Sequence, residues 1–181
     1  MSRLIDDIVR KLDENEPLDV DSCKRLLLYG LYDSVSGLKN RHALDLRIRD
    51  IETKSKNNNV GVVFADVNGL KFTNDNYGHN AGDTLIRKCA FLLISHFGKE
   101  NCYRTSGDEF VVIVDECEDY KFLTEITSFK RMINDKNIPP ISIGWYYNDK
   151  CNNVKLAINK AEEEMRREKR IFYKHHSCFE R

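Results

Sequence analysis

Several features that would point to particular classes of protein are missing from this sequence. Lysines and arginines number 29 and so do aspartates and glutamates, so there is no net positive field to attract nucleic acid or an anionic membrane surface. No window approaches 18 consecutive apolar residues, and residues 1–11 are charged rather than continuously apolar. We therefore expect a cytoplasmic protein that binds a small ligand, with no nucleic-acid partner and no membrane span or secretory signal.

Paired cysteines, internal repeats and low-complexity segments are also missing. The six cysteines are scattered without a CxxC pair, and several lie in apolar stretches, where a reduced thiol packs as a small hydrophobic group. We expect all of them to be free thiols. The 181 residues and the 41% hydrophobic content are typical of one globular domain with a short appendage.

The spacing of apolar residues predicts an α+β domain. Residues 2–32 show helical spacing interrupted at Glu16 and Pro17, which predicts two short helices. Further along the chain we expect helices near 38–51, 80–97, 120–133 and 154–170, and strands at 60–65, 102–105, 110–114 and 141–147. The apolar run 60–65 suits a strand covered on both faces, and a hairpin joins the next two strands. This order favours a four- or five-stranded mixed or antiparallel sheet over a doubly wound parallel one.

The first 32 residues form a separate N-terminal helical segment in this scheme. They are either a dimerisation or signal-transmitting appendage, or helices that cover the core of the domain itself, and the lack of heptads favours the second alternative. The sequence leaves both open. We place the domain at residues 33–174 and a C-terminal tail at 175–181.

Carboxylates stand at the ends of two predicted strands. Asp108 and Glu109 lie on a turn just before the apolar run 110–114, and the run 60–65 ends on Asp66. Two strand ends can deliver these side chains to one point, where they would bind a hard divalent cation. Such a pairing suggests phosphate chemistry.

A segment rich in glycine, amides and carboxylates, residues 66–79, separates the strand at 60–65 from the helix near 80–97. Glycine allows a backbone to approach a ligand closely, and Lys71 can neutralise a phosphate oxygen. An amide together with a carboxylate can read the edge of a purine. The alternative is a loop stabilised by its own Asn and Asp side chains.

Six sequence blocks occur in a characteristic order. They are residues 33–41, residues 66–71, residues 74–75 with 78–79, residues 82–83, Arg104 with 106–110, and residues 142–144. Together they resemble the GGDEF domain of diguanylate cyclases over about residues 33–173, and six blocks in order are far more specific than one. The resemblance implies a palm-like sheet flanked by helices. It also implies condensation of two GTP molecules into cyclic di-GMP and pyrophosphate, with Mg or Mn, at the interface of a homodimer.

The resemblance assigns catalytic and metal-binding roles to the carboxylates. It implies that Asp66, Asp108 and the carbonyl of Val67 bind the metal. Glu109 is a further ligand or helps to deprotonate the attacking hydroxyl, and Asp108 is an equally good candidate for the base.

The resemblance also implies how the nucleotide is held. Lys71, with the backbone of Gly69 and Leu70, holds the β- and γ-phosphates, and Lys71 stabilises developing charge. Gly107 lies on the signature turn that GTP approaches closely.

The resemblance implies that a second set of residues binds the nucleobase. Asn74 and Asp83 recognise guanine. Because a carboxylate accepts hydrogen bonds from the N1 and N2 hydrogens of guanine, which adenine lacks, GTP is favoured over ATP. His79 lies beside the nucleotide or is only a structural hydrogen-bonding group.

Three departures from the family pattern have consequences. Ser106 replaces the first glycine of the signature, at a slight cost if its φ is negative and about 1 kcal/mol or more if it is positive. Lys169 aligns with a phosphate-contacting lysine, but Tyr173 stands where an arginine is usual, so Arg170 or Lys174 must substitute or one contact is lost.

The third departure is at the feedback site, where the aligned positions are Phe97 and Glu100. The arginine of that site is absent, so we expect no product inhibition through it. Two alternatives to an active cyclase stay open: a degenerate domain that binds GTP and Mg and regulates a partner, and a purely structural docking unit. An upstream sensory domain or partner would supply a controlling signal that these residues do not reveal.

Overall fold

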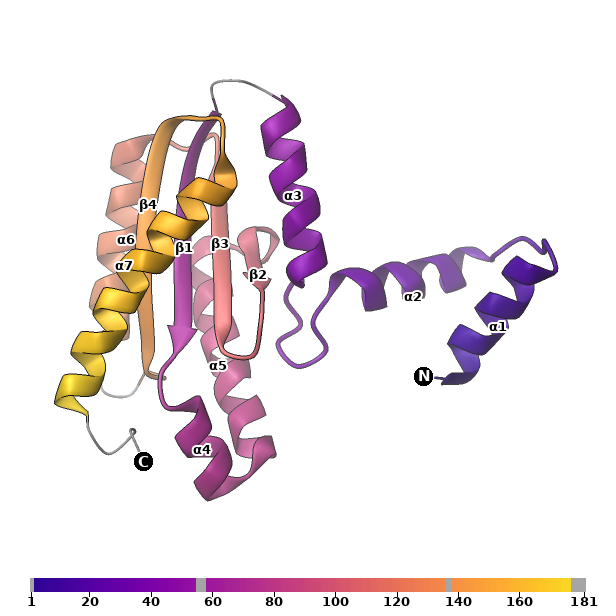
Figure 1. The fold of residues 1–181 in the computed structure, drawn as a ribbon, viewed down its shortest axis with the longest axis horizontal. Coiled ribbons are helices and arrows are strands. Elements are labelled where there is room, and N and C mark those ends of the chain that lie inside the picture. The colour runs from indigo at the N-terminus through magenta and orange to yellow at the C-terminus, as the bar shows by residue number, and fades with distance from the viewer. Residues whose placement is uncertain (1, 55–57, 136–137, 177–181) are drawn as a thin grey trace.

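The structure of the protein is a computed structural model, which describes residues 2–54, 58–135 and 138–176. Seven α-helices, one 3-10 helix and four strands follow one another in these ranges (Figure 1). In chain order they are α1 (Ser2–Asp13), α2 (Val20–Leu31), α3 (Arg41–Lys54), β1 (Asn58–Val67), α4 (Leu70–Tyr77), α5 (His79–Phe97), η1 (Lys99–Asn101), β2 (Cys102–Arg104), β3 (Glu109–Asp115), α6 (Asp119–Ile133), β4 (Ile141–Cys151) and α7 (Val154–His175).

The four strands form one antiparallel sheet in the order β2-β3-β1-β4. The predicted α+β class is therefore confirmed, and of the two predicted alternatives, mixed or antiparallel, the sheet is antiparallel. Strand β1 is central and buried on both faces: Val62 and Phe64 pack with α3 and α7, while Val63 and Ala65 pack with α5 and α6. This alternation explains why the strand is apolar almost without interruption.

Helix α7 lies directly on β4, because Gly144 has no side chain at the crossing. A Cβ atom there would lie 2.1 Å from both the carbonyl oxygen of Ala161 and the backbone nitrogen of Met165. Glycine thus allows the two backbones to touch. The path set by this crossing carries the last turns of α7 past the end of β1, where the predicted site lies (Figure 1).

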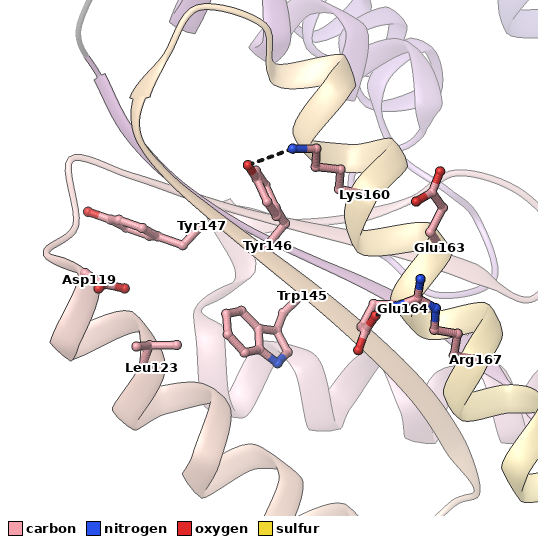
Figure 2. A pocket seen from close by; sticks show the side chains of 9 residues that line it. All are labelled: Asp119, Leu123, Trp145, Tyr146, Tyr147, Lys160, Glu163, Glu164 and Arg167. Carbon is pink, nitrogen blue, oxygen red and sulfur yellow. Dashed lines mark hydrogen bonds and ion pairs between the residues drawn. The ribbon is translucent and has the colours of Figure 1, made fainter.

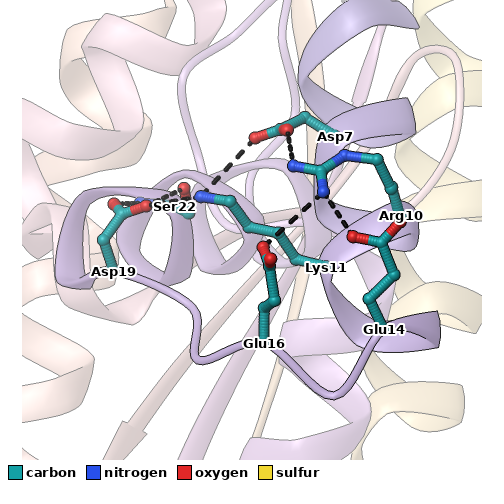
Figure 3. A network of polar contacts seen from close by, with 7 residues as sticks. All are labelled: Asp7, Arg10, Lys11, Glu14, Glu16, Asp19 and Ser22. Atoms are coloured by element: carbon teal, nitrogen blue, oxygen red, sulfur yellow. Dashed lines mark hydrogen bonds and ion pairs between the residues drawn. The ribbon is translucent and has the colours of Figure 1, made fainter.

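Helices α1 and α2 extend away from the sheet instead of covering it (Figure 1). The two predicted helices are confirmed, but Leu27 and Leu28 are 60% and 56% exposed, and among the described side chains of these helices Leu31 is the one that packs against a core cluster. The expectation that they cover the domain is therefore wrong for all but the end of α2. Ion pairs of Arg10 and Lys11 with surrounding carboxylates join α1 to the start of α2 (Figure 3).

Other sequence-based boundaries need correction. Residues 70–77, expected within a loop, form α4, because Gly69 adopts φ +70° and turns the chain from β1 into a helix. Strand β4 continues to Cys151, and α7 continues to His175, so the expected tail begins with a helical residue; residues 177–181 lie outside the described part. All five described cysteines are free. No helix in the described ranges has the length and apolar character needed to cross a membrane.

Candidate functional site

The end of β1 and the start of β3, which carry the carboxylates identified in the sequence, lie side by side at one end of the sheet (Figure 1). Asp66, near the end of β1, is paired with Glu109 at the start of β3 in the antiparallel register. The Val67 N–H donates a hydrogen bond of 3.0 Å to the carbonyl of Asp108. The predicted convergence of two strand ends is thus present in the structure.

Asp66 is a buried carboxylate with one cationic partner. Its side chain accepts a hydrogen bond of 2.6 Å from Lys169 Nζ, which lies 4.0 Å from Asp108 Oδ2. Burial raises the pKa of Asp66 to about 6, and the charges of Asp108 and Glu109 add to this effect while Lys169 opposes it. Burial lowers the pKa of Lys169, but the hydrogen bond and charge of Asp66 outweigh it and raise this pKa overall.

Arg104 holds the turn that carries Asp108. Its Nε and Nη2 donate to the carbonyl of Gly107 at 3.2 and 2.7 Å, and its Nη1 donates to Asp33 Oδ1 at 2.8 Å. Burial alone would raise the pKa of Asp33, but hydrogen bonds from Ser36 and Arg104 lower it overall. Roles for Arg104 and Asp33 were not predicted from the sequence, although both residues stand in the matched blocks, which was the available signal.

Ser106 fits the signature turn without strain. The non-glycine residues with positive φ in the described ranges are Asn15 and Glu116, so Ser106 falls under the low-cost alternative. Its hydroxyl donates a 2.7 Å hydrogen bond to Glu109 Oε2. The serine therefore orients a predicted catalytic carboxylate, which a glycine in this position could not do.

The segment between β1 and α4 is held from two directions. Asn68 is buried, and its side-chain amide exchanges hydrogen bonds of 2.9 and 3.1 Å with the hydroxyl of Ser142 on β4. The N–H of Gly69 donates to the hydroxyl of Tyr173 on α7 at 3.1 Å. Tyr173, which the sequence analysis treated only as a missing arginine, thus contacts the expected phosphate-binding backbone.

The expected guanine-reading residues lie on two packed helices, α4 and α5. The Asn74 side chain lies against Gly82, where a Cβ atom would come within 1.9 Å of Asn74 Oδ1. Asp83, half-buried, follows Gly82 directly. Lys71 and His79 are exposed, Lys71 in the first turn of α4 and His79 at the start of α5.

A basic groove borders the carboxylates. It has a volume of about 890 Å³ and is lined by Tyr173 and four cationic residues of α7, namely Arg166, Lys169, Arg170 and Lys174. These positions recur every three or four residues, so they share one helical face. Lys169 and Arg170, predicted to contact phosphate, therefore lie on the same surface.

The carboxylate set suits a divalent cation in charge and chemistry. Among the described residues, no three His, Cys, Asp or Glu side chains are drawn together into a finished metal site. Asp66, Asp108 and Glu109 nevertheless interact electrostatically, with Lys169 supplying one positive charge. An all-oxygen donor set with excess negative charge is the type preferred by Mg²⁺ and Mn²⁺.

A second hollow lies between α6, β4 and α7 (Figure 2). Its wall includes Trp145, Tyr146 and Tyr147, and Lys160 Nζ lies 3.0 Å from the hydroxyl of Tyr146. None of the site residues predicted from the sequence lines it.

Comparison with known proteins identifies the family. The family model described as "Diguanylate cyclase, GGDEF domain" matches residues 30–172, and the chain belongs to this family. The family resemblance and the palm-like fold expected from the sequence are therefore confirmed. The match begins three residues before the domain boundary we predicted.

Curated relatives include proteins of opposite activity. The chain is 37% identical over 91 residues to the cyclic di-GMP phosphodiesterase PdeR of Escherichia coli, covering 50% of the chain and 14% of the relative. It is 30% identical over 112 residues to the diguanylate cyclase DgcS of Shewanella oneidensis, covering 57% of the chain and 38% of the relative. The chain thus corresponds to less than half of either relative.

A solved structure extends the similarity to the fold of nearly the whole chain. The coiled coil and GGDEF domain of DgcB from Caulobacter crescentus, in complex with c-di-GMP, matches with a TM-score of 0.70 at 18% identity. The match covers 93% of each chain. At this identity the similarity concerns the fold alone.

Proposed function

We propose that this chain is a diguanylate cyclase, which condenses two GTP molecules into cyclic di-GMP with release of pyrophosphate. The observation that carries the proposal is the pairing of Asp66 with Glu109 across two strand ends, with Lys169 in contact with Asp66. This pairing places carboxylates and a cation at one end of the sheet. Attack of a 3′-hydroxyl on an α-phosphate requires both kinds of charge.

In this proposal Asp66, Asp108 and the Val67 carbonyl hold Mg²⁺ or Mn²⁺. A cation held by these residues would supply the positive charge that acidifies the attacking hydroxyl and offsets charge on the leaving pyrophosphate. Glu109 accepts the proton or joins the ligand set, and Ser106 holds its carboxylate in place. Arg104 keeps the turn rigid through its two bonds to the Gly107 carbonyl.

The nucleotide would lie along α4, α5 and the basic face of α7. Asp83 accepts hydrogen bonds from the N1 and N2 hydrogens of guanine, and Asn74 bonds the remaining base edge. Lys71 and the backbone around Gly69 and Leu70 face the terminal phosphates, and Lys169 and Arg170 add positive charge from α7. Selectivity for GTP over ATP then depends on Asp83.

Two protomers are needed, because each binds one of the two GTP molecules that are condensed. The apolar residues of α2 that remain exposed, Leu27 and Leu28 among them, offer a surface to a second copy. Burying them in a dimer would remove apolar area from water, the main driving force of association. We place the active assembly as a homodimer in the cytoplasm, controlled by an upstream sensory domain or partner.

Incubation with GTP and Mg²⁺, followed by product detection, tests the proposal. Native protein should form cyclic di-GMP, and Asp108→Ala should form none. A matched control, Asp149→Ala, removes an exposed carboxylate on β4 and should retain activity. The initial rate should rise faster than linearly with protein concentration; a strictly first-order dependence would contradict the dimer mechanism.

A degenerate, non-catalytic regulator is the second candidate. The hydroxyl of Tyr173 accepts the hydrogen bond of the Gly69 N–H in the segment expected to bind phosphate, which favours this candidate. One relative is, in addition, a phosphodiesterase. Such a module would show a rise in melting temperature with GTP and Mg²⁺ but no product. The absence of any nucleotide-dependent shift would instead indicate a purely structural docking unit.

A further inference from the structure

The hydroxyl of Tyr173 is bonded to a backbone amide that the proposed function assigns to phosphate binding. Gly69 N–H donates to Tyr173 Oη at 3.1 Å. One helical turn earlier, Lys169 donates to Asp66 at 2.6 Å, so α7 contacts both ends of the segment 66–69. The Tyr173 ring also meets Phe172 edge-on, with centroids 5.4 Å apart.

A backbone amide has one hydrogen to donate. While that hydrogen is bonded to the tyrosine hydroxyl, it is not available to a phosphate oxygen of a bound nucleotide. A hydroxyl is neutral, so it leaves the charge of the surrounding cations unchanged. Arg170 and Lys174 line the same groove and still attract phosphate.

We propose that Tyr173 is a specificity-determining residue, which withholds the Gly69 amide from the terminal phosphate so that this chain binds GTP and GDP with similar affinity. The inference rests on the proposed function, because it takes Gly69 to be part of the nucleotide site. It deepens that function by naming the phosphate that is poorly recognised. The β-phosphate remains held by the cations of α7 and by Lys71.

The test compares the affinities of GTP and GDP, each with Mg²⁺, by calorimetry on the full chain. Native protein should show dissociation constants for the two nucleotides within about threefold of each other. Tyr173→Phe keeps the ring and removes the hydroxyl, which frees the amide for a charge-assisted bond to phosphate. GTP should then bind on the order of tenfold more tightly, and GDP should change by less than about threefold.

Tyr147→Phe is a matched control. Its hydroxyl also bonds a backbone group and donates to the carbonyl of Cys117 at 3.0 Å. Tyr147 pairs with Gly61, however, and not with the end of β1 that carries the site. This variant should lose some stability and leave both affinities unchanged. Thermal unfolding of each variant identifies any protein that has failed to fold.

Amide NMR provides a readout independent of affinity. The Gly69 resonance should shift in Tyr173→Phe without nucleotide, and should shift again in that variant when GTP is added. A native preference for GTP above about tenfold, or weaker GTP binding by Tyr173→Phe, would overturn the inference while leaving the proposed function intact. Failure of all three folded proteins to bind either nucleotide would overturn the proposed function and this inference with it.

Discussion

Lys169 Nζ lies 2.6 Å from Asp66 Oδ1, across a sequence separation of 103 residues. This contact joins the end of the central strand to the last helix. Because Asp66 is buried and has two further carboxylates nearby, Lys169 offsets part of a costly negative charge. The same ammonium lies 4.0 Å from Asp108, so it acts on both halves of the carboxylate pair.

Replacing Lys169 by methionine should destabilise the fold. The change keeps most of the apolar stem but leaves the Asp66 carboxylate without its cation, at a cost of roughly 1–3 kcal/mol. Urea unfolding at neutral pH measures this difference. Lys174→Met, on the same helical face but exposed, is the control and should stay within about 0.5 kcal/mol of native. Equal losses in the two variants would count against the role given to the Lys169–Asp66 contact.

The raised pKa of Asp66 predicts a pH dependence of metal binding. The folded protein holds this proton with a pKa of about 6, against 3.8 ordinarily, and only the ionised form binds a cation. Mg²⁺ affinity should therefore fall as pH drops through about 6, by up to about tenfold per pH unit below it. Calorimetric titration of Mg²⁺ between acidic and neutral pH provides the measurement.

The stability of the metal-free protein should also depend on the ionisation of Asp66, but it should fall as pH rises, whereas metal affinity increases. Since the folded state binds the Asp66 proton more tightly than the unfolded state, ionisation lowers stability as pH rises from about 4 to about 6. Asp66→Asn should remove this contribution, visible as a difference between the two pH profiles of unfolding in chelator. Parallel profiles for native and variant would show that the pKa of Asp66 is not raised.

Restoring glycine at position 106 should have a small effect. The φ angle of Ser106 lies outside the left-handed region, so Ser106→Gly relieves no strain and loses one exposed hydrogen bond to Glu109. We expect a stability change below about 1 kcal/mol and a change in product formation below about tenfold. Ser106→Ala should behave alike, because both variants lose the hydroxyl. A hundredfold gain in Ser106→Gly alone would mean that the serine side chain blocks GTP.

Adding a methyl group at Gly144 should be severely destabilising. The new Cβ atom would meet backbone atoms of Ala161 and Met165 at 2.1 Å, and backbone cannot move aside without shifting α7. We expect a loss of about 3 kcal/mol, at the upper end of overpacking effects. In Gly30→Ala, the control within α2, the methyl group meets no atom within 4 Å beyond its neighbours in the helix and should stabilise by up to about 1 kcal/mol. Urea unfolding of both variants measures the contrast.

The spacing of apolar residues predicted most of the helices and strands, because each helix or strand has its own characteristic spacing. The central strand could be recognised from its apolar run, and the meeting of Asp66 with Glu109 was predicted because each carboxylate stands at the end of an apolar run. Helix α4 was missed because Asn74, Asp75 and Asn76 are typical of loops. The left-handed Gly69 starts that helix, and its φ angle is not readable from composition.

By itself the sequence determined the family, the α+β class and the carboxylates and cations available to the site. Only the tertiary structure decided which of them touch. Tyr173 meets Gly69 from 104 residues away, and this depends on the backbone contact at Gly144 that sets the course of α7. Likewise, α1 and α2 are helical by local periodicity, whereas their exposure is a property of the whole fold. Periodicity is local, but the pairing of distant side chains depends on how packed elements cross.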